Sequence, residues 1–181
     1  MCILYFNISV KSQYLLGFNE PDHKEQANLT AAQAAIMWKE VDKNGVGKVL
    51  VSPAVTNLNW IDQVFHECHD CRVDNISIHV YDWNCNAHHA MKKLLHALDR
   101  FHKPIWLTEF ACPCTTSANE QLRYMKEILP LLEGALYLFL CAGFASRWMV
   151  AGNFVDQSAS LLKPYSTELT PPGHYYNNFI H

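Results

Sequence analysis

The sequence predicts a parallel α/β fold in which short buried strands alternate with helices along the chain. Apolar, β-rich runs bounded by Gly, Pro, Asn or Asp lie at residues 14–18, 48–51, 75–80, 104–108 and 135–140. Helix-like stretches fill the gaps between them, at residues 30–42, 58–68, 86–102 and 118–132. The middles of successive runs are about 30 residues apart, which is the length of one βα unit. This regular spacing favours a parallel α/β architecture over a fold that separates strands from helices.

The first and last of these helices carry recognisable start signals. Thr30 precedes the alanine-rich stretch "AAQAAIMWKEV" and is a good N-cap residue, and either Ser117 or Asn119 can cap the last helix. The last apolar run, "GALYLFLCAGFA" at residues 134–145, is shorter than the ~20 residues of a membrane span. We expect it to form a buried strand and its exit.

A doubly wound sheet and a (β/α)8 barrel both fit this rhythm. No Gly-rich phosphate loop follows the first strand, so the main signal for a nucleotide-binding doubly wound sheet is missing, and no cofactor is predicted. Polar side chains stand instead where strands end. Glu20 follows "YLLGF", and Glu109 closes "PIWLTE". Because barrel active sites are built at these ends, we predict a TIM-barrel type of fold with about five βα units, in one domain over residues 1–181.

Composition excludes several classes of partner. Only 17% of the 181 residues are charged, and the net charge is −3 with no basic run. Nucleic acid and anionic membrane surfaces are therefore not expected partners. Half of the residues are hydrophobic, which is enough for one sizeable core.

Two glutamates at strand ends suggest the chemistry of the site. Glu20 and Glu109 arrive at the same predicted rim on separate strands. We expect aromatic residues to flank both of them, Phe18 and Trp83 near Glu20 and Trp106 and Phe110 near Glu109. Cleavage of a glycosidic bond needs a proton for the leaving oxygen and a carboxylate that stabilises or traps the oxocarbenium-like centre. Aromatic rings stack on sugars. The pattern predicts a carbohydrate cleft with two carboxyl groups, and the residues alone do not assign the two roles.

Four motifs identify a family. "YLLGFNEPDHKEQANLT", "LVSPAV", "LNWIDQVFHECHDCRVDNISIHVYDW" and "PIWLTEFAC", in this order, resemble glycoside hydrolase family 128, whose members are endo-β-1,3-glucanases built on a (β/α)8 barrel. The resemblance runs from Tyr14 to the C-terminal "LTPPGHYYNNF". It implies a retaining hydrolase of β-1,3-glucan in which Glu20 is the acid/base and Glu109 the nucleophile. Retention implies carboxyl groups ~5 to 5.5 Å apart.

The resemblance also implies contacts to the substrate, a β-glucan polysaccharide or oligosaccharide. Asn19 would bind the 2-hydroxyl of the sugar, and His79 and Tyr81 would line the subsite around the nucleophile. The residues expected to touch the sugar are Asn19, His79, Tyr81, Trp83, Trp106 and Tyr137, and no metal is expected among them.

Two features depart from the family pattern. Relatives carry roughly three further strands before the "GFNEPD" strand, in a fold that needs ~250 residues, whereas Met1 stands 13 residues before Tyr14 here. We therefore expect an N-terminally shortened barrel, monomeric unless a partner covers the exposed sheet edges. Relatives also place a Trp in the last strand as a floor for the sugar. Leu138 occupies the equivalent position here, beside Tyr137 and Phe139, which predicts weaker stacking.

Two other functions stay open. A catalytically inactive β-glucan-binding protein would keep the aromatic residues, although it would gain nothing from both carboxylates. A zinc-stabilised interaction protein would use the dense group His66, Cys68, His69 and Cys71, although its spacing matches neither a C-x2-C…C-x2-C ribbon nor HExxH.

The seven cysteines do not settle the compartment. Cys68 with Cys71, or Cys112 with Cys114, can be oxidised pairs or plain thiols. For Cys112-Pro-Cys114, which lacks the spacing of a thioredoxin-type pair, we expect local packing or a disulfide to elsewhere. The N-terminal segment shows neither a basic n-region nor a clear cleavage site, so no signal peptide is predicted. The family resemblance implies a secreted or cell-wall protein.

Overall fold

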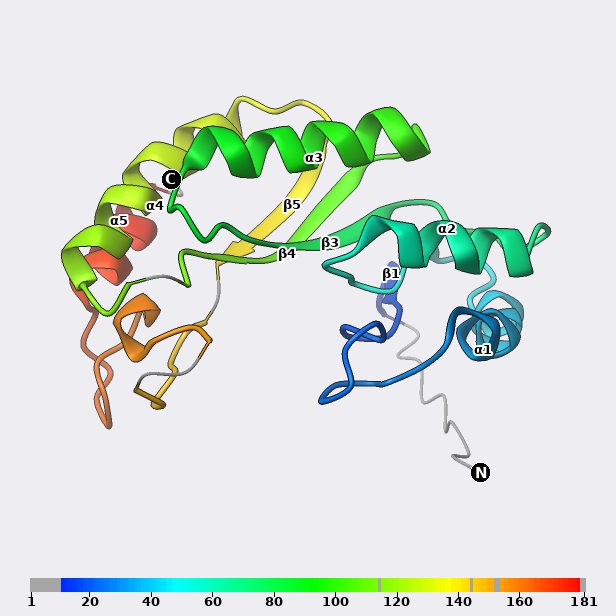
Figure 1. Cartoon of the computed structure of the whole chain (residues 1–181), viewed down its shortest axis with the longest axis horizontal. Helices are drawn as coiled ribbons and strands as arrows, with labels where there is room; N and C mark the ends of the chain where they lie inside the picture. Colours follow the sequence, from blue (N-terminus) through cyan, green and yellow to red (C-terminus); the bar gives the residue numbers. More distant parts are fainter. Residues whose placement is uncertain (1–10, 114, 144, 152–153, 180–181) are drawn as a thin grey trace. The chain divides into compact units, whose positions relative to one another are not determined.

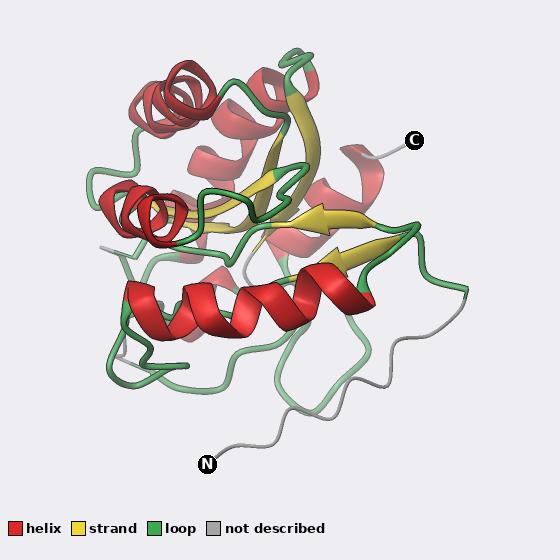
Figure 2. Cartoon of the chain, turned by 90° about the vertical axis from the view of Figure 1, so that its right-hand side faces the viewer, coloured by secondary structure: helices red, strands yellow, loops and turns green. Residues whose placement is uncertain are grey.

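The computed structural model describes residues 11–113, 115–143, 145–151 and 154–179. Its helices and strands alternate along the chain, as the sequence predicts (Figures 1 and 2). The chain divides into two compact units, Met1–Ile78 and His79–His181. The prediction of a single domain over the whole chain is not tested by this division and stays a prediction.

The first unit contains two short parallel strands and two helices. They are β1 (Tyr14–Leu16), α1 (Ala31–Asn44), β2 (Val49–Val51) and α2 (Leu58–Glu67). β1 pairs with β2 in the register Tyr14 to Val49, and an isolated parallel bridge joins Val51 to Asn75. Thr30 caps α1 in a capping box with Gln33, as its position predicts.

Trp38 and Arg72 connect the elements of the first unit around its core. Trp38 of α1 is 1% exposed, and its indole N–H donates to the carbonyl of Arg72 at 2.9 Å. The Arg72 guanidinium pairs with Asp42 at 3.3 Å and with Asp74 at 2.9 Å. Asp74 also accepts the backbone N–H of Leu50 at 2.7 Å, so this half-buried cluster joins α1 to β2 and to the segment before β3.

A three-stranded sheet with strand order β3-β4-β5 forms the basis of the second unit. Its elements are β3 (Ile76–Tyr81), which begins in the first unit, then α3 (Ala87–Phe101), β4 (Ile105–Ala111), α4 (Ala118–Glu133), β5 (Leu138–Gly143), the 3-10 helix η1 (Gln157–Ala159) and α5 (Pro171–Phe179). Figure 1 shows α3 and α4 running beside β4 and β5. β4 and β5 are parallel. The cap of α4 is Ser117 rather than Asn119.

The predicted parallel α/β class is confirmed, and the four helices predicted between strands begin and end within two residues of their predicted bounds. The last strand is displaced. It begins at Leu138 instead of residue 135, because Gly134 caps α4 and a turn follows in which the Leu138 N–H donates to the carbonyl of Ala135 at 2.9 Å. These backbone groups are used before the strand can start.

The prediction that this run is buried is wrong. Phe139 is 52% exposed and Leu140 is 38% exposed. Within the part of the chain that the structure describes, β5 is the end strand of its sheet and pairs only with β4. A strand at a sheet edge leaves side chains uncovered where a further neighbour would cover them. In the described residues, no helix combines the length and the apolar character needed to cross a membrane.

Candidate active site

The backbone of the first unit places Asn19 and Glu20 directly after β1. Asn19 forms a parallel bridge with Ala54, and the N–H of Glu20 donates to the carbonyl of Ala54 at 2.8 Å. Glu20 is half-buried, and its φ is 37°, in the left-handed region that non-glycine residues rarely adopt. The sequence predicts the strand end correctly but contains no signal for this conformation.

The residues after Glu20 anchor the loop that it begins. Pro21 is buried. The Asp22 carboxylate accepts the N–H of Asn57 at 3.2 Å and the hydroxyl of Thr56 at 3.3 Å. The His23 ring nitrogen Nε2 is 2.7 Å from the same hydroxyl. "EPDH" therefore attaches the Glu20 loop to the start of α2, a positioning function that the sequence analysis missed.

Gly17 allows β1 to approach the chain that follows β2. A Cβ atom at this position would lie 2.7 Å from Pro53 N and 2.7 Å from Trp38 Cζ3. Such distances are far inside van der Waals contact, and one of the two atoms belongs to the backbone. The glycine of "LLGFNEPD" is therefore required by close packing below the Glu20 loop.

The second unit brings three predicted site residues together. The Tyr81 hydroxyl donates to Oε2 of Glu109, and His79 Nδ1 lies 3.4 Å from the same oxygen. The His79 side chain is 1% exposed and that of Glu109 is 26% exposed. His79 and Tyr81 alternate along β3, and Glu109 comes from the neighbouring strand β4. A carboxylate held this way has a fixed oxygen and a partly open face.

Exposed aromatic rings extend from this cluster. The Tyr81 ring meets Phe154 edge to face, with centroids 4.9 Å apart, and Phe154 meets Trp83 in the same manner at 5.3 Å. Trp83 is 60% exposed and Phe154 is 47% exposed. Phe154 was not predicted from the sequence, because it follows β5 in an irregular segment, without a strand end to mark it. Its neighbour Val155 is buried in a cluster with Ala111, against which Tyr81 packs.

Trp106 and Tyr137 are not brought to this cluster. Trp106 is the second residue of β4 and is 4% exposed, with its ring stacked on Phe139 at 5.3 Å. The Tyr137 carbonyl accepts the N–H of Ile105, at the amino end of β4. A strand rises about 3.3 Å per residue, so these positions lie roughly 10 Å or more along the strand from Glu109. Their predicted contact with the sugar gains no support from this placement.

Leu138 is the residue that the family resemblance predicts at the position of the relatives' tryptophan. Leu138 begins β5, and the carboxyl end of this strand is formed by Ala142 and Gly143. Gly143 pairs with Phe110, the residue after Glu109. Leu138 therefore lies at the amino end of the strand, and its equivalence to the family tryptophan stays a prediction. Small residues stand at the end of β5 that faces the glutamate.

The loop between β3 and α3 is fixed by a buried carboxylate. Asp82 is 3% exposed, and its Oδ1 accepts the N–H groups of Asn84 at 3.1 Å and Asn86 at 3.0 Å. Lys93 Nζ lies 3.9 Å from Oδ2 of Asp82 and donates to the carbonyl of Tyr81 at 3.2 Å. The hydrogen bonds and the nearby cation compensate for the burial of this charge.

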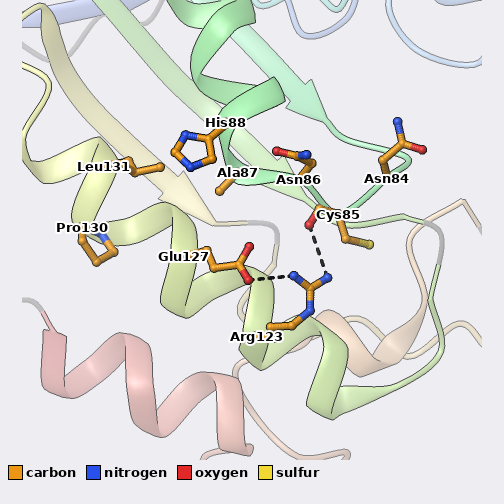
Figure 3. Close-up of a pocket in the computed structure, with 9 residues that line it drawn as sticks. All are labelled: Asn84, Cys85, Asn86, Ala87, His88, Arg123, Glu127, Pro130 and Leu131. Carbon is orange, nitrogen blue, oxygen red and sulfur yellow. Dashed lines mark hydrogen bonds and ion pairs between the residues drawn. The ribbon is translucent and has the colours of Figure 1, made fainter.

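A cavity of about 510 Å³ opens beside this loop, between the start of α3 and α4 (Figure 3). Arg123 donates to Glu127 at 2.8 Å and to the carbonyl of Cys85 at 3.4 Å. Hydrogen bonds to Glu120 and Glu127 raise the pKa of the Arg123 guanidinium above its ordinary value. Both acidic partners of Arg123 lie on α4 itself, so these ion pairs stabilise the helix.

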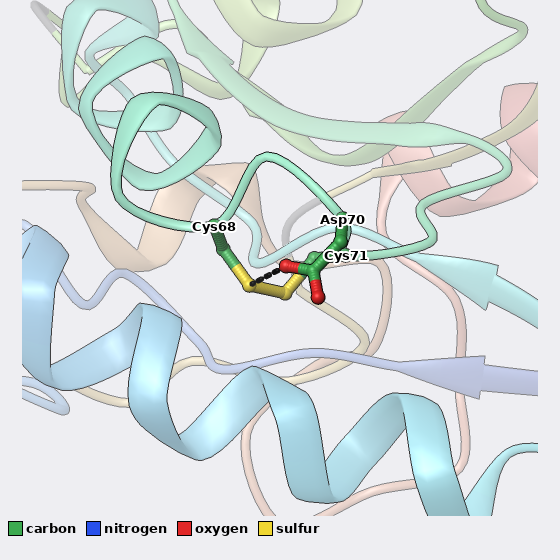
Figure 4. A group of neighbouring side chains, drawn as sticks. All are labelled: Cys68, Asp70 and Cys71. Atoms are coloured by element: carbon green, nitrogen blue, oxygen red, sulfur yellow. Dashed lines mark hydrogen bonds between the residues drawn. A yellow bond between two sulfur atoms is a disulfide. The ribbon is translucent and has the colours of Figure 1, made fainter.

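Two disulfides lie among the residues that the structure describes. Cys68 bonds to Cys71 (Figure 4), and Cys85 bonds to Cys112. Cys112 therefore pairs elsewhere, as its motif suggests, and not with Cys114, which lies outside the described residues. The Cys68–Cys71 bond removes both thiolates from the group that was considered for zinc. The alternative of a zinc-stabilised protein loses its sulfur ligands.

The Glu109 carboxylate, held by Tyr81 and His79, lies at the end of its strand, where barrel enzymes build their active sites, and exposed aromatic rings lie beside it. The chain belongs to the Glycosyl hydrolase catalytic core family, whose sequence profile matches residues 5–176. Family membership confirms the resemblance that the four motifs predict.

Solved structures of glycoside hydrolase family 128 are similar over most of the chain. An endo-β-1,3-glucanase of subgroup II from Sorangium cellulosum is 35% identical, with a TM-score of 0.81 over 92% of this chain and 70% of that one. A subgroup I enzyme from Amycolatopsis mediterranei, solved with laminaritriose and laminaribiose, is 26% identical, with a TM-score of 0.77 over 91% of this chain and 71% of that one.

A curated relative is the alkali-sensitive linkage protein 1 of Schizosaccharomyces pombe. It is 32% identical over 129 residues, which is 67% of this chain. The chain spans 23% of the length of that protein.

Proposed function

We propose that this chain hydrolyses β-1,3-glucan with retention of configuration, on a fold of the (β/α)8 type. The observation that carries the proposal is the Glu109 carboxylate, held by Tyr81 and His79 at the carboxyl end of β4 in a chain of the Glycosyl hydrolase catalytic core family. The similar structures from Sorangium and Amycolatopsis are endo-β-1,3-glucanases, which supports the choice of substrate and of barrel fold.

In the proposed reaction, Glu109 attacks the anomeric carbon and forms a covalent glycosyl-enzyme, while Glu20 protonates the leaving oxygen. Glu20 then takes a proton from the water that releases the sugar. The Tyr81 hydroxyl and His79 contact one oxygen of Glu109, so the other oxygen is the one aimed at the substrate. The proposed separation of the two carboxyl groups is ~5 to 5.5 Å, as retention requires.

Asn19 and Trp83 complete the proposed site. Asn19 is exposed and stands directly before Glu20, which supports the proposed hydrogen bond from Asn19 to the 2-hydroxyl of the reacting sugar. Trp83 offers an exposed ring for stacking. The two disulfides suit an oxidising compartment, so we propose a secreted or cell-wall location.

The test compares laminarin hydrolysis by the native chain with that by Glu109→Gln and Glu20→Gln, measured as new reducing ends. Each substitution is expected to lower turnover by at least about a thousandfold. Azide should restore turnover to Glu109→Gly as a glycosyl azide of inverted configuration, since it replaces the lost nucleophile. Product anomers observed by NMR during native hydrolysis should keep the β-configuration.

The same experiment separates the proposal from its rival. Glucan binding without turnover by the native chain would contradict hydrolysis and leave a glucan-binding protein. Inverted products would contradict the role of Glu109 as nucleophile.

A further inference from the structure

The Cys85–Cys112 disulfide joins the two chain segments that leave the cluster around Glu109. Tyr81, which donates to Glu109, ends β3 and stands four residues before Cys85. Glu109 stands three residues before Cys112 on the neighbouring strand. The disulfide therefore links the two strands a few residues after Tyr81 and Glu109, the two partners of the hydrogen bond.

Further bonds turn this connection into a small closed unit. The N–H of Asp82 donates to the carbonyl of Ala111 at 3.2 Å. The N–H of Cys85 donates to the carbonyl of Asp82 at 3.0 Å. Cys85 is 3% exposed with φ at 49°, and Cys112 is fully buried. A left-handed cysteine at the end of a short turn returns the chain toward β4, where the second sulfur lies.

We propose that the Cys85–Cys112 disulfide is a positioning element for catalysis, which holds the Tyr81 hydroxyl against Oε2 of Glu109. This inference rests on the proposed function. β3 ends at Tyr81 and β4 ends at Ala111, so regular strand pairing stops there. Beyond this point the crosslink maintains the distance between the two segments, and the hydrogen bond from the Tyr81 hydroxyl to the Glu109 carboxylate is sensitive to that distance. Displacement of a catalytic contact by about 1 Å can cost on the order of a hundredfold in rate.

The crosslink acts on the orientation of the nucleophile, so its loss lowers kcat more than it raises KM. The variant is Cys85→Ser with Cys112→Ser, and the matched control is Cys68→Ser with Cys71→Ser, which removes the disulfide of the first unit. We expect kcat on laminarin to fall by about tenfold or more in the first pair and by less than about twofold in the control.

A double-mutant cycle with Tyr81→Phe distinguishes positioning from general stabilisation. If the disulfide acts through Tyr81, its removal should change kcat by less than about twofold once the hydroxyl is gone, because coupled residues are not additive. Equal factors in the two backgrounds would overturn the proposal and leave the bond a role in stability alone. Circular dichroism and the melting temperature confirm that each variant is folded at the assay temperature.

A second arm covers failure of the serine pair to fold. The Cys68→Ser, Cys71→Ser chain is folded with its remaining disulfide and then treated with dithiothreitol, which is oxidised to its cyclic disulfide as Cys85 and Cys112 become thiols. Amide hydrogen exchange over residues 79–82 and 109–112 is measured before and after. Exchange should accelerate there, and unchanged exchange would overturn the proposal. This readout does not require turnover, so absence of laminarin hydrolysis contradicts the proposed function and not this inference.

Discussion

The two glutamates are held in place by different means. Glu20, in the first unit, is placed by its backbone: a left-handed φ of 37°, a bond from its N–H to Ala54 and a buried proline after it. Glu109, in the second unit, lies in a regular strand and is placed by two side chains, those of Tyr81 and His79. The backbone at Glu20 thus has an uncommon conformation, whereas Glu109 has a regular strand backbone and accepts a hydrogen bond from the side chain of Tyr81.

The difference predicts which substitutions each glutamate position is sensitive to, in the first unit around Glu20 and in the second unit around Glu109. The first half should be sensitive to changes in backbone shape some residues away from Glu20, even where no functional group is lost. The second should tolerate such changes better but lose activity when a single polar atom is removed. At the two glutamates themselves, the uncommon feature is a backbone conformation at Glu20 and a buried polar neighbour, His79, at Glu109.

Gly17→Ala should give the largest effect on stability. The new Cβ would lie 2.7 Å from Pro53 N and 2.9 Å from Pro53 Cα, so the backbone must move. We expect a loss of about 1 to 3 kcal/mol in the free energy of unfolding, measured with urea and tryptophan fluorescence.

Gly134→Ala is the matched control for this experiment. A Cβ there would meet its nearest atom, the Pro130 carbonyl oxygen, at 3.5 Å, an ordinary contact, and its φ of −75° suits alanine. A loss at Gly134 as large as that at Gly17 would contradict the view that close packing below the Glu20 loop is special.

Local sequence patterns predicted most of the elements because periodicity and caps are local. Thr30 marks the start of α1 correctly, and the polar residues that close β3 and β4 meet as strand-end residues of a parallel sheet should. Two features depend on contacts distant in the sequence, which local patterns do not contain: Phe154 reaches Tyr81 from beyond β5, and the partner of Cys112 is Cys85. The late start of β5 was missed for a different reason, because residues 135–137 continue its apolar run but lie in a turn.

Glu20→Gly and Glu109→Gly should change stability in opposite directions. Glycine adopts the left-handed region without the steric cost that other residues bear, so Glu20→Gly is expected to raise the free energy of unfolding by up to about 1 kcal/mol while removing activity. Glu109→Gly removes the partner of Tyr81 and weakens a strand, so it should lower the free energy of unfolding by about 1 to 2 kcal/mol.

Glu20→Gln separates the two contributions at the first position, since it keeps the backbone conformation and removes only the charge. Its free energy of unfolding should stay within about 0.5 kcal/mol of the native value. If Glu20→Gly proves less stable than Glu20→Gln, the backbone at this position is not strained, and the comparison between the two halves fails.

Tyr124→Phe should give the smallest change in the free energy of unfolding. The sign of this change tests whether a buried hydroxyl destabilises the second unit. The Tyr124 ring is 2% exposed, and its hydroxyl has no hydrogen-bond partner among the described residues. Removing a buried polar atom without a partner should stabilise the fold by up to about 1 kcal/mol at neutral pH. Tyr165→Phe, at a position 91% exposed, is the control and should leave stability unchanged.

The pH dependence of the stability of Tyr124→Phe gives a second, independent test of whether the Tyr124 hydroxyl is buried. Burial first, and then the negative charge of Asp82, raise the pKa of Tyr124 above the ordinary value of 10.0. The folded chain therefore holds this proton more tightly than the unfolded chain, so the associated stability is complete below pH ~10 and is lost as the pH rises toward the folded pKa. Tyr124→Phe removes this loss, and its advantage in urea unfolding should grow between about pH 7 and pH 10.5. An advantage that stays constant or shrinks over this range would mean that the phenol of Tyr124 is solvated in the folded chain and that its burial costs no stability.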